Sequence, residues 1–233
     1  NNIFRGSELF SVQLRGAFEA IKGLEGYQNQ DYREYNVETK IAFPRIIAPF
    51  LPHKYRYRNN MRSELLFSYN MQNRPEFHRR VLSSAWRYYW KSSLNRWSYR
   101  FDLIDINYVY MPWISATFKK DYLDDASNRN AILRYNYEDL FILKSGINVA
   151  FNNGVDAMRA NFEFGGNFLC AISHLFGAER NSNGQYTLFN IAYAQYLKGD
   201  IDYTRLVTID SKNTLALHCG LGVAFPYGNS KIL

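Results

Sequence analysis

Hydrophobic and polar residues alternate strictly along residues 214–227. One phase holds Leu215, Leu217, Cys219, Leu221, Val223, Phe225 and Tyr227, and the other holds small residues and His218. A soluble strand averages about five or six residues, whereas a tilted strand crossing a bilayer needs about nine to eleven. The pattern therefore predicts a strand in the wall of a transmembrane β-barrel, with its apolar row facing lipid.

Eight earlier stretches repeat this alternation, and turn residues or longer connections separate them. The strands expected from the pattern are residues 9–20, 35–43, 64–72, 80–91, 99–110, 141–151, 157–172, 195–209 and 214–227. We therefore expect an all-β fold, an antiparallel transmembrane β-barrel to which residues 1–233 contribute nine strands as part of one domain. Residues 1–4 are a candidate for the end of a tenth strand.

The two phases give two sets of candidate functional residues, one on each side of the expected wall. The lipid-facing set is Phe10, Val12, Leu14, Phe18, Leu143, Ile147, Val149, Phe162, Phe164, Phe168, Leu215, Leu217, Leu221, Val223 and Phe225. The polar set, expected to face the lumen, is Arg15, Glu38, Lys40, Arg159, Asn161, Glu163, Lys198, Asp200, Asp202 and His218.

Three local departures from regular strands are expected. The apolar phase of residues 99–110 shifts between Leu103 and Ile104, which indicates a β-bulge. The segment 152–154, with the sequence Asn-Asn-Gly, is typical of a tight hairpin turn because Asn and Gly accept a positive φ. Arg205 falls on an apolar phase, so we expect it near a membrane interface, where its charge can reach water.

The connections predict an asymmetry between the two ends of the sheet. Alternate connections of an antiparallel meander lie on the same side, and outer-membrane barrels have long loops on one side and short turns on the other. The long connections are 22–31, 112–139 and 173–194, and the short ones are 92–96, 152–156 and 210–213. Residues 44–62 and 73–78 break this rule, and residues 113–137 are a candidate for a short helix.

The composition agrees with a barrel and excludes a membrane-spanning helix. A mean hydropathy of -0.38 with 21% charged residues resembles a soluble domain, but every second residue of a barrel wall is polar. The longest uncharged run, residues 213–230, contains Gly and Pro and alternates in polarity, so it does not predict a helix. Aromatic residues make up 17% of the chain, which suits strands and interfacial girdles.

The net charge of +7 is compatible with nucleic acid, anionic lipid or lipopolysaccharide, or simply with basic loops. Basic and aromatic side chains interleave densely at residues 53–58, but no nucleic-acid-binding motif surrounds them, so we expect no nucleic-acid partner. The chain has two cysteines, Cys170 and Cys219. They provide no disulfide framework or zinc-site spacing, and strands two places apart in a sheet lie about 10 Å apart, beyond disulfide reach.

The sequence has no motif for covalent chemistry or cofactor binding, so we expect neither an enzyme nor a bound cofactor or metal. Asp121, Asp124 and Asp125 could be read as a calcium site, but carboxylates in a loop are usually solvated. Asp200 and Asp202 could be read as a catalytic pair. Lys198 on the same face, and Arg159 and Glu163 on the neighbouring strand, favour an ion-pair lattice instead. His218 is expected to act as a hydrogen-bonding spacer.

Three segments together resemble the barrel of the BamA/TamA superfamily of outer-membrane assembly factors, most closely its Bacteroidota members. They are residues 2–8 with the strand that follows, residues 102–109, and the closing residues 224–233. The resemblance covers nearly the whole chain, and the closing segment is its most specific part. In that family this strand leads into the sixth extracellular loop, and the Arg-Gly-Phe tip of the loop folds back into the lumen.

The resemblance implies a sixteen-stranded barrel, of which this chain spans the end of the second strand to the eleventh, without the POTRA domains, the first strand and the last five strands. It implies an integral outer-membrane location and contact with outer-membrane lipids and lipopolysaccharide. The partners that it implies are unfolded outer-membrane protein clients and accessory assembly lipoproteins or a TamB-like periplasmic protein. The implied activity is insertion or translocation of clients through a lateral gate, by non-covalent strand templating.

Two other functions fit the same strands. A passive porin or transporter barrel would need the same wall but no gate. A soluble β-barrel that binds a small lipid is disfavoured by the strand lengths and by apolar rows as long as seven residues.

Overall fold

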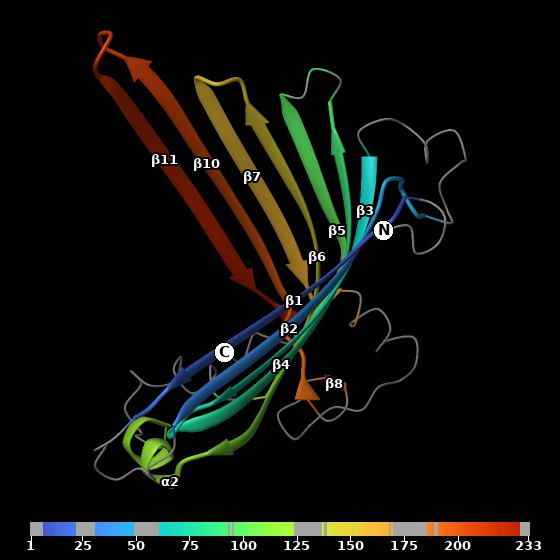
Figure 1. The fold of residues 1–233 in the computed structure, drawn as a ribbon, viewed down its shortest axis with the longest axis vertical. Helices are drawn as coiled ribbons and strands as arrows, with labels where there is room; N and C mark the ends of the chain where they lie inside the picture. Colours follow the sequence, from blue (N-terminus) through green and yellow to red (C-terminus); the bar gives the residue numbers. More distant parts are fainter. Residues whose placement is uncertain are drawn as a thin grey trace.

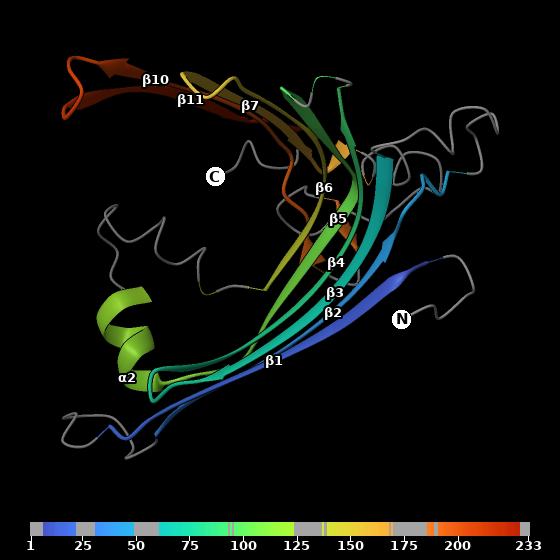
Figure 2. The same ribbon diagram turned by 45° about the horizontal axis from the view of Figure 1, so that its top comes forward.

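The computed structural model describes residues 7–21, 31–48, 61–92, 94, 96–123, 137, 139–167, 169, 186–188 and 191–228. Within these residues the protein is all-β, with nine antiparallel strands in one open, twisted and curved sheet (Figures 1 and 2). The strands are β1 (Leu9–Glu19), β2 (Tyr32–Phe43), β3 (Met61–Asn73), β4 (Phe77–Lys91), β5 (Trp97–Ile114), β6 (Leu140–Asn152), β7 (Asp156–Gly165), β10 (Tyr196–Thr208) and β11 (Thr214–Pro226).

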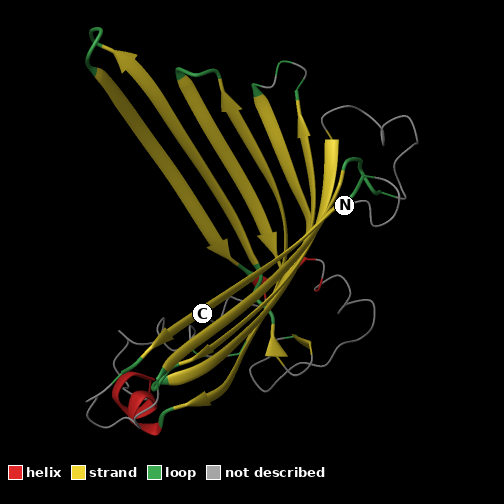
Figure 3. Cartoon of the chain, in the orientation of Figure 1, coloured by secondary structure: helices red, strands yellow, loops and turns green. Residues whose placement is uncertain are grey.

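The sheet is a meander in which each strand pairs with the next strand along the chain, except that β7 pairs with β10. The intervening β8 (Thr187–Leu188) and β9 (Ile191–Ala192) form a separate small hairpin. Helical structure in the described residues is short: α2 (Ala116–Phe118) continues as the π-helical η1 (Lys119–Leu123) and lies beyond the end of β5 (Figure 3). This agrees with the expected short helix within residues 113–137.

The connections fall at the two ends of the sheet as the sequence predicts. We call the end with the β4–β5, β6–β7 and β10–β11 connections the turn end, and the opposite end the loop end. At the β6–β7 turn, Gly154 has a φ of 92°, the Asn152 side chain accepts a hydrogen bond from Gly154 N (2.8 Å), and the Asn153 side chain accepts one from Asp156 N (2.6 Å). The predicted hairpin turn is therefore confirmed.

The predicted β-bulge is also confirmed. The pairing of β4 with β5 shifts between Trp86 and Arg87, and the pairing of β5 with β6 shifts between Asp102 and Asp105. Leu103 is the extra residue relative to β4, because Ile104 pairs with Trp86, and the Leu103 carbonyl accepts a hydrogen bond from Ser145 Oγ (2.7 Å). The side chain of β6 thus satisfies a backbone group that the bulge removes from the ladder.

One predicted strand is too long. The alternation predicts a strand over residues 157–172, but β7 ends at Gly165. Gly166 has a φ of 75°, and a Cβ there would lie 2.3 Å from the Ala194 carbonyl oxygen. The chain therefore leaves the sheet at a glycine that the alternating pattern passes over. Phe168 and Cys170 lie outside the described residues.

Candidate functional site

The strand register separates the side chains into two faces. All the predicted lumen residues, from Arg15 on β1 to His218 on β11, share the face that we call the polar face. The predicted lipid-facing residues that the structure describes share the opposite, apolar face. The alternation predicted from the sequence is thus continuous across all nine strands.

Burial on these faces is inverted relative to a soluble sheet. On β2, Tyr35 and Val37 of the apolar face are exposed, whereas Glu34, Asn36 and Glu38 of the polar face are half-buried. On β10, Ile201 and Tyr203 are exposed, whereas Asp200 and Asp202 are half-buried. Since side chains converge on the inside of a curved sheet, this difference indicates that the polar face is the concave one.

Charged residues on the apolar face of the described strands occur only near its ends. Arg33 and Arg80 lie toward the loop end, and Asp156 and Arg205 lie toward the turn end, 3.8 Å apart between Oδ1 and Nε. Arg205 also has an exposed side chain, so its charge is accessible at the end of the face. Between these positions the apolar face of the described strands carries no charge.

Aromatic rings gather at both ends of this uncharged band. At the turn end, Trp90 stacks on Tyr99 with ring centroids 5.3 Å apart, and Trp97 lies 4.8 Å from Phe151. At the loop end, Tyr108 lies 6.4 Å from both Tyr110 and Phe141. Tyr99 and Tyr108 belong to one strand, and because of the β-bulge between them they pair with residues eight apart on β6, which corresponds to about 27 Å along the strand.

A short segment covers the apolar face at the turn end of β3 and β4. Residues 44–48, which we call the strap, follow β2 and pack against Tyr88 through Ile46 and Ala48. Ser63 Oγ accepts a hydrogen bond from Ile47 N (2.8 Å) and donates one to the Arg45 carbonyl (2.9 Å). The Tyr88 hydroxyl donates to the Ile47 carbonyl (2.9 Å). Two side chains thereby satisfy three backbone groups of the strap.

A second covered area lies toward the loop end of the apolar face. Leu143, which the sequence predicts to face lipid, is only 8% exposed because it packs with Leu169 and Tyr193. The residues that follow β7 therefore cover this position, and Leu143 is not open on the apolar face as its strand neighbour Ile147 is.

The polar face contains an ion-pair cluster centred on Arg87 of β4. Arg87 lies 3.4 Å from Asp102, 3.4 Å from Asp105 and 4.0 Å from Glu64, measured between guanidinium nitrogens and carboxylate oxygens. Lys40 adds a pair with Glu64 (3.5 Å), and Arg100 adds one with Asp102 (3.2 Å). We call these six residues the Arg87 cluster, in which three cations match three carboxylates.

The β-bulge makes this cluster possible. In a regular strand, residues three apart point to opposite faces, so Asp102 and Asp105 would be separated. The bulge shifts the phase, and both carboxylates reach Arg87 from the polar face. Asn107 donates a hydrogen bond to Asp105 (2.8 Å) and accepts one from Ser83 (2.8 Å), which further fixes this carboxylate.

Farther along the sheet, the ion-pair lattice expected among Arg159, Glu163, Lys198, Asp200 and Asp202 does not form, because in the described residues no two of these five lie within ion-pair distance. Glu163 pairs with Lys144 (3.4 Å), and Asn161 donates a hydrogen bond to Asp200 (3.3 Å). His218 Nε2 lies 3.5 Å from Asp202 Oδ1. Gly220 makes room for this carboxylate, because a Cβ there would lie 2.8 Å from Asp202 Oδ1.

Among the described residues, Lys198 has no ion pair, and neither has Arg159. The register places it opposite Asp202. Even so, among the residues that the structure describes, Arg159 has no carboxylate within ion-pair distance.

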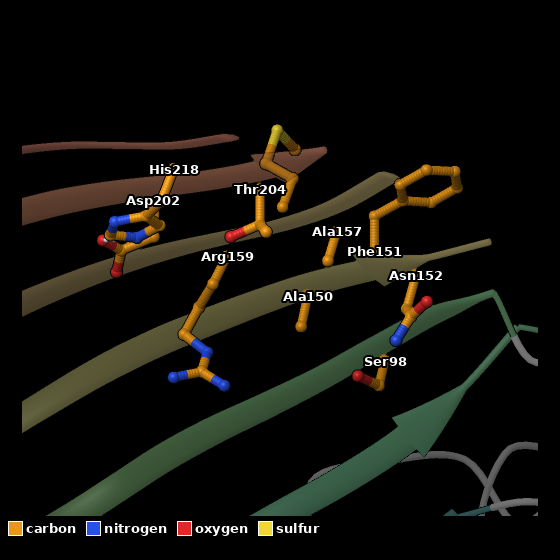
Figure 4. Close-up of a pocket in the computed structure, with 10 residues that line it drawn as sticks. Ser98, Ala150, Phe151, Asn152, Ala157, Arg159, Asp202, Thr204 and His218 are labelled. Carbon is orange, nitrogen blue, oxygen red and sulfur yellow. Dashed lines mark ion pairs between the residues drawn. The ribbon is translucent and has the colours of Figure 1, made fainter. Parts of the chain in front are cut away.

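A groove of 420 Å³ surrounds Arg159 at the turn end of the polar face (Figure 4). Figure 4 shows Arg159, Ala150, Ser98 and Asn152 on one side of the strands and the ring of Phe151 on the other. Other lining residues of the polar face are Ala157, Asp202, Thr204 and His218. Ser98 also lines an adjoining hollow of 310 Å³, whose lining includes Arg62, Tyr89 and Lys91 of the polar face and Met61, Trp90 and Tyr99 of the apolar face. We call the two together the turn-end groove.

The structure does not support the candidate chemical sites that the sequence offered. In the described part of the chain, no three His, Cys, Asp or Glu side chains gather where they could hold a metal ion. Asp121 lies in η1, but Asp124 and Asp125 are outside the described residues. Asp200 and Asp202 point from one strand to different partners, Asn161 and His218. Cys219 is free and exposed on the apolar face.

The Arg87 cluster and the strap were not predicted from the sequence. Nor was the lack of a carboxylate partner for Arg159 among the described residues. The alternation places Glu64 and Arg87 on polar phases, but it does not show that they meet. The bulge at Leu103 was the signal that could have brought Asp102 and Asp105 together, because it predicts a change of face between them.

A comparison with known protein families found no match to this chain, and a comparison with curated proteins found none either. Over the described residues, no helix has the length and apolar character needed to span a membrane.

Proposed function

We propose that this chain forms part of the wall of a transmembrane β-barrel in the bacterial outer membrane. The observation that carries the proposal is the inverted burial, in which the apolar face is exposed and the polar face is the more enclosed one. On the inner strands β3, β7 and β10, Phe67, Phe162 and Ile201 are 46%, 51% and 46% exposed. An apolar surface that continues across nine strands is too large to be left in water, and lipid is the solvent that it suits.

The flanks of the apolar face support the same proposal. Outer-membrane barrels have an apolar band about 25 Å tall, bounded by aromatic girdles. The rings near Tyr99 and Tyr108 are about 27 Å apart along a strand, and a strand tilt of about 35–45° shortens this distance to about 19–22 Å across the bilayer. The strap also fits this location, because its hydrogen bonds to Ser63 and Tyr88 satisfy backbone groups that lipid could not.

We further propose that the barrel inserts or translocates other outer-membrane proteins. Support comes from the resemblance of residues 2–8, 102–109 and 224–233 to the BamA/TamA superfamily. The physical mechanism is non-covalent: a client strand cannot enter hydrocarbon with unsatisfied N–H and C=O groups, so a strand edge of the barrel serves as its template. The nine strands described form the rigid wall of this device, and the Arg87 cluster ties four of them together.

The membrane location is tested by a depth series of arginine substitutions on one strand. Ile201→Arg places a charge within the uncharged band of β10, and Val207→Arg places one beyond Arg205 at the turn end. We expect Ile201→Arg to lower the free energy of unfolding in lipid vesicles by about 2–4 kcal/mol and Val207→Arg by at most about 1 kcal/mol. Equal effects, or a wild-type protein that stays dissolved without detergent, would contradict the proposal.

The assembly activity is tested in cells by depleting the protein. An assembly factor predicts that folded outer-membrane proteins decline before the permeability to small solutes changes. A passive porin predicts the reverse order, with unchanged levels of folded outer-membrane proteins. The two readouts are the heat-modifiable migration of client barrels and the rate of uptake of a small hydrophilic dye.

A further inference from the structure

We propose that the turn-end groove binds an extended acidic peptide segment, with Lys91 and Arg159 holding two of its carboxylates. The inference concerns the polar face and goes beyond the assembly or pore function. It rests on the proposed membrane location only because that location directs the apolar face to lipid and leaves the groove to ligands from water.

The two cations lie in one row across the sheet. The strand register runs from Lys91 to Ser98, then to Ala150 and Arg159. Three strand steps of about 4.8 Å separate Lys91 from Arg159, or about 14 Å. Between them lie only a hydroxyl and a methyl group, so the floor of the groove is uncharged and low.

Both cations are available to a ligand. Lys91 and Arg159 have exposed side chains, and neither has a carboxylate within ion-pair distance in the described part of the chain. Arg62, in the same groove, lies 4.5 Å above the ring of Tyr89 and likewise has no acidic partner among the described residues. Arg87, by contrast, has three carboxylates within ion-pair distance.

The spacing selects the ligand. The backbone positions of the two cations are about 14 Å apart, and residues i and i+4 of an extended chain are about 13 Å apart and point to the same side, so each cation can hold its own carboxylate. Guanidinium groups also bind carboxylates through paired hydrogen bonds. The groove therefore fits a peptide with two acidic residues separated by three others.

Asp202 limits the groove beyond Arg159. It lies one strand step farther along the same row and pairs with His218. A third acidic residue would be repelled there, whereas a basic residue one or two positions after the second acidic residue would be attracted. The expected ligand is therefore acidic at two positions four apart, followed closely by Lys or Arg.

The test uses a fluorescein-labelled peptide, Glu-Ser-Gly-Ser-Glu-Ser-Lys with blocked termini, and the full-length protein in vesicles of zwitterionic phosphatidylcholine. Fluorescence anisotropy measures the binding. We expect Lys91→Gln and Arg159→Gln each to weaken the binding about tenfold, and Arg159→Lys to weaken it less. Arg15→Gln, on the polar face of β1 away from the groove, is the matched control and should leave the binding unchanged.

Two further measurements test the specificity of the groove. A peptide with Gln in place of both Glu residues should not bind. Asp202→Asn should weaken binding of the Lys-containing peptide and strengthen binding of a peptide with Glu in place of that Lys.

Several results would overturn the proposal. One is a peptide affinity that does not change in Lys91→Gln and Arg159→Gln. Another is equal affinity for the Gln peptide and the Glu peptide. A third is complete displacement of the peptide by inorganic phosphate at the same concentration. Binding that requires anionic lipid in the vesicles would assign the groove to a membrane surface instead. Loss of peptide binding in a protein that still integrates into vesicles would leave the membrane proposal intact. A protein that stays soluble without detergent would contradict that proposal, while the peptide assay could still be performed in solution.

Discussion

The two halves of the sheet use similar residues in different ways. In β3–β6, Arg87 is surrounded by carboxylates on the polar face, and the strap covers the apolar face behind it. In β7, β10 and β11, Arg159 faces an open groove, and the apolar residues behind it are bare. An arginine on a polar phase is therefore either held between carboxylates or left exposed, and the positions of the neighbouring carboxylates make the difference.

The largest expected difference is between removing these two arginines. Arg87→Ala leaves Glu64, Asp102 and Asp105 close together with less cationic compensation. Because the Arg87 side chain is 24% exposed, we expect a loss of about 2–4 kcal/mol of unfolding free energy, slightly below the range for fully buried pairs. Arg159→Ala should cost at most about 0.5 kcal/mol. Urea titration in vesicles, followed by tryptophan fluorescence, measures both, and equal losses would remove the distinction between the halves.

The strap provides the second comparison. Ser63 is completely buried under the strap and makes two hydrogen bonds to its backbone, so Ser63→Ala leaves a donor and an acceptor unsatisfied. We expect a loss of about 1–3 kcal/mol in the same titration. Ser84→Ala, on the same face but outside the strap, is the control and should change the stability by less than about 0.5 kcal/mol. Similar values for the two variants would mean that the strap does not stabilise this half.

Two glycines of the polar face, Gly146 on β6 and Gly222 on β11, give a third comparison between the halves. A Cβ at Gly146 would lie 2.8 Å from the Phe162 carbonyl oxygen, whereas one at Gly222 would lie 3.6 Å from Asp200 Cβ, an ordinary contact. We therefore expect Gly146→Ala to destabilise the protein by about 1–2 kcal/mol, and Gly222→Ala to have little effect. The unfolding midpoints in urea compare the two, and a larger effect at Gly222 would contradict the tight packing around Gly146.

The smallest expected effect is a local pH dependence in the β10–β11 turn. Hydrogen bonds from the Asn213 side chain, and from the backbone N–H groups of Lys212 and Asn213, hold the pKa of Asp210 below its ordinary value. A lowered folded pKa gives stability that is complete above the unfolded value of about 3.9 and is lost as the pH falls through the folded value.

The exchange rate of the Asn213 amide hydrogen, corrected for its intrinsic pH dependence, should therefore rise below about pH 4. Asp210→Asn should abolish this rise. The Arg87 cluster should keep its protection over the same range if the turn opens by itself, and simultaneous opening would show that the two halves are coupled.

Features that depend on neighbouring residues could be predicted from the sequence alone. Alternation sets which face a side chain occupies, so the polar and apolar faces could be predicted from Arg15 to His218. The bulge at Leu103 and the turn at Gly154 were also predictable, because a phase shift and a positive-φ residue are local signals.

Which side chains meet across strands depends on the folded arrangement of the whole chain and could not be predicted from local patterns. The Arg87 cluster joins residues from four strands through the pairing register, and the strap reaches Tyr88, about forty residues away, through a hydrogen bond of 2.9 Å. The end of β7 at Gly165 depends on residues 194–196 approaching the following glycine, which alternation cannot show. Likewise, Arg159 and Arg87 look alike in the sequence, and only the positions of the carboxylates distinguish a charge that stabilises the sheet from one that remains open to a ligand.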